Sequence, residues 1–158
     1  MKYTSLLEIL NTNLLNDYIS YTLVIRYLAL EEILGYNVGG IDLYNHLIQY
    51  RQHDHLHTID QFCDLFYSIK YNKRIVEPLV IGVQGIVIDG SHRLACAMIL
   101  DIDEIPIVNV QQGAISLQNN IKWIKSFYNT QQSNMIIDKA NELIEYYKRL
   151  SIDKIGKL

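Results

Sequence analysis

The N-terminal part of the chain carries apolar residues at helical spacing. The stripe is formed by five leucines, at Leu6, Leu7, Leu10, Leu14 and Leu15. Their offsets place them on one face of a helix. We therefore expect the segment from Ser5 to Leu34 to be mainly helical. Three glycines, at Gly35, Gly39 and Gly40, then predict a loop.

Two further helices are predicted before the middle of the chain. Asp42 is a suitable N-cap for a helix that continues through Tyr50. The polar stretch RQHDHLHT ends at Thr58, which is a good N-cap for a helix from Ile59 to Tyr71.

The second half of the chain begins with short β-branched runs. Two such runs lie around Val80 and Val87, and we expect them to pair as a hairpin. A helix from Leu94 to Leu100 and a strand from Ile105 to Val110 follow, and beyond Gly113 the pattern turns helical again. This order predicts an α+β fold, a small mixed β-sheet wrapped by helices.

Composition limits the number of domains and the class of partner. A chain of 158 residues with 49% hydrophobic content can bury one core, so we expect residues 1–158 to form a single domain. A net charge of −3 makes nucleic acid an unlikely partner, because phosphate recognition needs a basic face. The two cysteines, Cys63 and Cys96, fit buried thiols better than a disulfide.

The longest apolar run, from Leu23 to Leu34, is interrupted by Arg26, Glu31 and Glu32. These charges make it too broken for a membrane span. No export signal is evident in the first residues. We therefore expect a cytoplasmic protein with no membrane association.

The most informative segment is the turn Asp89-Gly90-Ser91-His92-Arg93, which follows a β-branched strand. Gly90 permits a tight turn and Ser91 is a candidate N-cap for the next helix. Free backbone N–H groups and the positive end of the helix dipole favour an anion there, and Arg93 can clamp phosphate oxygens. The turn is therefore a candidate phosphate site.

Each residue of the turn also has a purely structural interpretation. Asp89 could be only a turn former, or a carboxylate that holds Mg²⁺ or takes a hydroxyl proton. His92 could close the turn or stabilise transferring charge. Arg93 could pair with Glu77 or Asp89, or bind phosphate, and Ser91 could cap the helix or reach phosphate.

At these residues the chain resembles the ParB/sulfiredoxin fold. The resemblance covers a core of about residues 58–110 and includes the strand at Pro78–Ile81, the turn, the Ala-rich helix at 94–97 and the Ile-Pro strand opening at Ile105. The turn looks most like the Asp-Gly-His-His-Arg motif of the free serine kinases of that fold, with Ser91 in place of one histidine. Ser91 also stands where sulfiredoxins carry the reactive cysteine.

The resemblance implies a small-molecule kinase. Its phosphoryl donor would be ATP or ADP with Mg²⁺, and its acceptor the hydroxyl of a serine-like, sugar or polyol metabolite. Asp89, His92 and Arg93 would be catalytic, and Gly90 and Ser91, with His92 and Arg93, would bind the nucleotide. The segment from Ile121 to Ile124 also resembles chains associated with surface-polysaccharide biosynthesis. The alternative is a non-catalytic nucleotide- or DNA-binding module, or a nuclease.

Residues upstream of the turn offer weaker candidates. The serine kinases of this fold use an upstream acidic residue near the substrate hydroxyl, which makes Asp54 and Asp60 weak catalytic candidates; surface charge or capping explains each as well. The alternation of His53, His55 and His57 suggests zinc, but a solvated polar loop is the better interpretation because no fourth ligand stands at a usual spacing.

Overall fold

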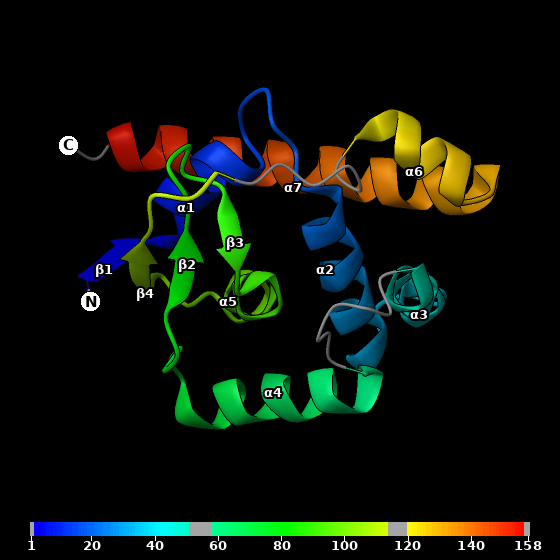
Figure 1. Cartoon of the computed structure of the whole chain (residues 1–158), viewed down its shortest axis with the longest axis horizontal. Coiled ribbons are helices and arrows are strands. Elements are labelled where there is room, and N and C mark those ends of the chain that lie inside the picture. The colour runs from blue at the N-terminus through cyan, green and yellow to red at the C-terminus, as the bar shows by residue number, and fades with distance from the viewer. Residues whose placement is uncertain (1, 51–57, 114–119, 157–158) are drawn as a thin grey trace.

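The computed structural model describes residues 2–50, 58–113 and 120–156, which form seven helices and one four-stranded sheet (Figure 1). In chain order the elements are β1 (Lys2–Ser5), α1 (Leu6–Asn13), α2 (Tyr21–Ile33), α3 (Gly40–Tyr50), α4 (Ile59–Asn72), β2 (Leu79–Ile81), β3 (Val87–Asp89), α5 (Ser91–Leu100), β4 (Glu104–Asn109), α6 (Ile121–Phe127) and α7 (Thr130–Gly156).

The sheet is mixed, with the strand order β1-β4-β2-β3. The predicted hairpin is confirmed, since β2 and β3 pair antiparallel. Strand β4 runs parallel to β2 and antiparallel to β1. The α+β class and the mixed sheet are therefore confirmed, whereas β1 was not predicted.

The prediction that Ser5 to Leu34 is mainly helical is confirmed by α1 and α2, but it is wrong for the residues between these two helices. Residues 2–5 pair with β4 as a strand, and Ser5 then caps α1 by accepting a hydrogen bond from the Glu8 N–H at 3.2 Å. Between α1 and α2 the Ser20 N–H bonds back to the Asn13 carbonyl at 2.9 Å. Leu6, Leu7 and Leu10 thus belong to a short helix, Leu14 is its C-cap, and Leu15 lies in the return of the chain that follows.

Asn13 explains why α1 ends where it does. Its amide donates to the carbonyls of Ile9 and Gly85, at 2.8 and 3.0 Å, and its carbonyl accepts from the Val87 N–H at 3.0 Å. The side chain is 2% exposed. Asn13 therefore joins the end of α1 to the β2–β3 hairpin with two hydrogen bonds and bonds back into α1 with a third. The side chain is buried, so losing a partner there is costly.

Helix α2 lies at the centre of the molecule, between α5 and α3 in Figure 1. Nine of its residues are buried, which places apolar side chains on every face. A helix that is hydrophobic all round must be enclosed by other elements, and α2 contacts α3, α4, α5 and α7. Arg26 is the charged residue enclosed with it, at 3% exposure.

The start of α4 follows the prediction. Thr58 accepts from the Gln61 N–H, and the Gln61 side chain accepts from the Thr58 N–H, forming a capping box. The predicted role of Asp42 as an N-cap is wrong, because α3 already begins at Gly40. Glu32 accepts the N–H groups of Gly39 and Ile41 at that helix start.

Both cysteines are free thiols; Cys96 is buried as predicted, whereas Cys63 is only half-buried. Burial raises the pKa of Cys96 to about 12. Across the described parts of the chain, no helix has the length and apolar character needed to cross a membrane.

Candidate functional site

The turn between β3 and α5 is built around Gly90. Gly90 is the N-cap of α5 and has a φ of 108°, in the left-handed region that favours glycine. A Cβ at this position would lie 2.8 Å from Nη2 of Arg93 and 2.9 Å from Cγ of Leu79. Glycine is therefore required here for two reasons. The backbone conformation favours it, and the Arg93 side chain, which folds back over the turn, leaves no room for a Cβ.

The expectation that Ser91 caps α5 is wrong. Ser91 is the first residue of the helix, and the capping position is occupied by Gly90, which has no side chain to accept a hydrogen bond. The N–H groups of the first helical turn have no acceptor within the helix itself. An anion at this end would satisfy them and would also interact favourably with the helix dipole.

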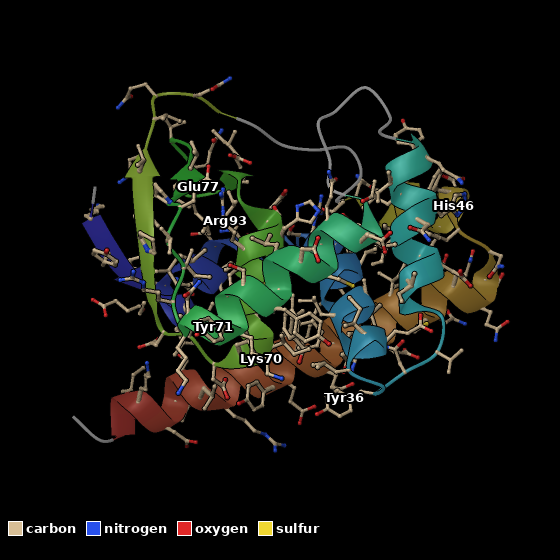
Figure 2. The ribbon with its side chains drawn as sticks, turned by 90° about the horizontal axis from the view of Figure 1, so that it is seen from below. Tyr36, His46, Lys70, Tyr71, Glu77 and Arg93 are labelled. Carbon is tan, nitrogen blue, oxygen red and sulfur yellow. The ribbon has the colours of Figure 1, made fainter. Side chains whose placement is uncertain are left out.

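Arg93 is the most constrained polar side chain of the turn. It is 8% exposed; its Nη1 lies 2.9 Å from Oε2 of Glu77 and its Nη2 lies 3.5 Å from Oδ2 of Asp89. Figure 2 shows Glu77 beside Arg93. The Nε of Arg93 is buried and finds no hydrogen-bond partner in the described part of the chain. Both predicted partners, Glu77 and Asp89, therefore contact Arg93, whereas its Nε–H has no acceptor among the described residues.

The two carboxylates that contact Arg93 are themselves open to solvent. The side chains of Glu77 and Asp89 are 78% and 71% exposed. Ion pairs with exposed partners contribute little, about 0–1 kcal/mol. An incoming phosphate can therefore replace either carboxylate at small cost, while the guanidinium stays in place because its stem is buried.

A cavity of about 280 Å³ lies beside the guanidinium. Polar side chains at its wall include Ser68, Asn72, Arg74 and Glu77, together with Arg93. Helix α4 supplies the first two, and the segment between α4 and β2 supplies Arg74 and Glu77. The cavity therefore places a second guanidinium in the surroundings of the turn.

His92 points into the protein, although it neighbours Arg93 in the sequence. It is 8% exposed and packs edge-on against Phe62, with ring centroids 4.8 Å apart. Its Nε2 lies 2.7 Å from the Tyr44 hydroxyl and accepts a 3.4 Å hydrogen bond from Nε of Arg26. The ring therefore anchors the first turn of α5 to α2 and α3.

Arg26 and Tyr44 are residues of this site that the sequence reasoning missed. Burial raises the pKa of Tyr44 well above its usual range, against the opposing effect of the Arg26 charge, so the phenol stays protonated. Arg26 could have been recognised from its position inside an apolar run. A charged side chain among apolar neighbours on a buried helix needs polar partners inside the fold.

Of the remaining candidates, Asp89 and Ser91 lie in the turn itself, whereas Asp60 does not contact it. Asp89 ends β3 with its carboxylate exposed, and Ser91 is half-buried. Asp60 is exposed in the first turn of α4, and no hydrogen bond or ion pair joins it to the turn within the described residues. Asp54, like His53, His55 and His57, lies outside the described residues.

The same described ranges contain no group of three or more His, Cys, Asp or Glu side chains that could hold a metal ion. Asp89 and Glu77, which both contact Arg93, are the two carboxylates described beside the turn. One or two carboxylates together with substrate phosphates usually hold Mg²⁺ at phosphoryl-transfer sites.

Comparison with protein-family models, curated proteins and solved structures gives no match to this chain.

Proposed function

We propose that the chain is a small-molecule kinase with a ParB/sulfiredoxin-like fold, which transfers a phosphoryl group from ATP or ADP to a hydroxyl of a serine-like, sugar or polyol metabolite. The observation that carries the proposal is the buried guanidinium of Arg93, with its unpartnered Nε, at the start of α5. A desolvated donor beside free helix N–H groups is the arrangement that binds phosphate. The sequence resemblance supplies the reaction class.

The residues of the turn fit a phosphoryl donor. Arg93 and the first N–H groups of α5 would hold its phosphate oxygens, and Arg74 lines the same cavity. The cavity of about 280 Å³ is just below the size of whole-ligand pockets, about 300–1,000 Å³, so it suits the phosphate end of the donor. The rest of the nucleotide would lie outside it.

Asp89 has two possible tasks in this proposal. As a base it accepts the proton of the acceptor hydroxyl; the hydroxyl oxygen then forms a bond to the transferred phosphorus, and the bond to the leaving phosphate oxygen breaks. As a ligand it holds Mg²⁺, which neutralises charge on the phosphates. Its exposed carboxylate is free to turn from Arg93 towards either task.

His92 is proposed as a positioning residue. Its ring contacts Tyr44, Phe62 and Arg26 in the interior, so it acts on the phosphates through the placement of α5. The same observation favours a second candidate, a nucleotide-binding module without turnover, because a buried imidazole does not reach the transferring group.

The test is ³¹P NMR on the purified chain with ATP or ADP, Mg²⁺ and a pool of serine, sugars and polyols. We expect a new phosphomonoester signal that disappears in Asp89→Asn and persists in Asp153→Asn, a matched change of an exposed aspartate on α7. Broadened nucleotide resonances without product would favour the binding module. Neither product nor broadening would overturn both proposals.

A second variant tests the phosphate contact separately. Arg93→Lys keeps the charge but removes the planar fork, so we expect nucleotide to bind about tenfold more weakly or worse while the fold is retained. Unchanged nucleotide affinity in this variant would contradict the assignment of Arg93 to the phosphates.

A further inference from the structure

A second, larger cavity lies at the opposite end of α5 from the turn. Its volume is about 780 Å³, within the range of small-molecule sites. It opens between the end of α4 and the chain that leads from α5 into β4. Four apolar side chains, all buried or half-buried, line it: Ile69, Ile75, Leu100 and Ile102. An aliphatic group could therefore rest on this lining.

The charged side chains of this cavity separate by sign along the chain. Lys70, Lys73 and Arg74 come from the end of α4, and Lys70 is labelled in Figure 2. All three are exposed, and none of them forms an ion pair with another residue in the described ranges. They leave positive charge available at one side of the cavity.

The other side carries Asp101, Asp103 and Glu104, which follow the end of α5. Acidic groups at the C-terminal end of a helix are unfavourable, because the helix dipole is negative there. Lys154 lies 3.6 Å from Asp103, in an exposed pair. No ion pair relieves Asp101 or Glu104 in the described part of the chain. A cation in the cavity would relieve both the dipole and the carboxylates.

Each of the two helices that border the cavity ends at a residue with a left-handed backbone. Lys73 and Asp101 are the only non-glycine residues of the described chain with positive φ, at 60° and 57°. They end α4 and α5 respectively, and each donates its N–H back into its own helix. Both helices therefore stop at the cavity, each followed by charged residues of one sign.

We propose that this cavity binds a dipolar small molecule with an ammonium group at one end, a carboxylate or phosphate at the other, and an aliphatic spacer between them. The ammonium faces Asp101 and Glu104, the anion faces Lys70 and Lys73, and the spacer covers the apolar lining. A ligand of one sign would meet like charge on one side, whereas a dipolar ligand satisfies both. The proposal does not rest on the kinase hypothesis.

The test uses a series of ω-aminocarboxylates of increasing chain length, from 4-aminobutanoate to 8-aminooctanoate. Hexanoate and hexylammonium are the single-charge controls for 6-aminohexanoate. Binding is followed by ¹H–¹⁵N NMR of the backbone amides of the full chain. We expect shifts in residues 70–74 and 100–104, an optimum chain length, and affinity about tenfold above that of either control.

Two variants remove one charge from each side. Lys73→Asn keeps a residue that tolerates the left-handed backbone, and Glu104→Gln is nearly isosteric at an exposed position. Each should weaken 6-aminohexanoate severalfold without a change in melting temperature, and Lys148→Gln, an exposed lysine on α7, should change nothing. No shifts at these amides, equal affinity for the single-charge controls, or unchanged binding in both variants would overturn the proposal.

Discussion

Replacing Gly90 by alanine should destabilise the fold in two ways, both of which come from the added Cβ atom. The first is the backbone conformation, because φ is 108° and side chains other than glycine rarely adopt this region. The second is the contact that the new Cβ would make, 2.8 Å from Nη2 of Arg93 and 2.9 Å from Cγ of Leu79. Leu79 is fully buried in β2, so it cannot move aside freely.

The chain contains a matched control in Gly35. Its φ is 83°, and a Cβ there would meet nothing within 4 Å. Gly35→Ala should therefore cost only the left-handed conformation, about 1–2 kcal/mol. Gly90→Ala adds overpacking of about 1–3 kcal/mol, which gives about 2–5 kcal/mol in total.

Thermal and urea unfolding of both variants measure the difference. For a chain of this size, each kcal/mol lowers the melting temperature by about 2–4 °C, so Gly90→Ala should melt clearly below Gly35→Ala. Because the Cβ pushes on the guanidinium, nucleotide affinity should also fall in Gly90→Ala and stay unchanged in Gly35→Ala. Equal destabilisation in the two variants would refute the reasoning, since it would mean that Arg93 and Leu79 do not confine position 90.

Three further outcomes follow from buried groups. Asn13→Ala should destabilise the fold by about 1–3 kcal/mol for each buried partner that it leaves unsatisfied, whereas the exposed Asn11→Ala should have little effect; equal urea midpoints would contradict this. Ellman's reagent should label the partly exposed Cys63 much faster than Cys96, which is fully buried and whose pKa is raised to about 12. Equal labelling rates for the two thiols in the native protein would contradict this prediction. Burial, followed by the charges of neighbouring carboxylates, raises the pKa of Tyr27 to about 12, so the folded state holds the phenol proton more tightly than the unfolded state. The resulting contribution to stability is complete below pH 10 and is lost as the pH rises towards 12. Urea unfolding across this pH range should show a less steep loss of stability in Tyr27→Phe.

Local signals in the sequence account for much of the fold. Thr58 as an N-cap predicted the start of α4, and the two short β-branched runs around Val80 and Val87 predicted the hairpin. Strand β1 escaped because it has four residues and its pairing partner, β4, lies about a hundred residues further along the chain. No local pattern in the sequence indicates a pairing between residues so far apart, and so no strand was predicted before Ser5.

In the candidate site too, features set by neighbouring residues could be predicted, whereas features set by residues distant in the sequence could not. The turn at Gly90 and the start of α5 were recognisable from Asp-Gly and the Ala-rich run that follows, and both possible partners of Arg93 could be named. The direction of His92 could not, because it depends on Arg26 and Tyr44, which lie 66 and 48 residues away. Arg26 is buried because α3, α4, α5 and α7 pack around α2, and this packing exists only in the folded protein.

The different directions of His92 and Arg93 follow from helix geometry and bear on any mechanism at this turn. Neighbouring residues in a helix are separated by about 100° around its axis, so the two side chains leave the first turn of α5 towards different neighbours. Here the imidazole takes the inward direction and holds α5 to α2 and α3. The guanidinium takes the outer one, towards Glu77 and the small cavity. Changes at His92 should therefore appear first as altered stability, and changes at Arg93 as altered affinity for phosphate.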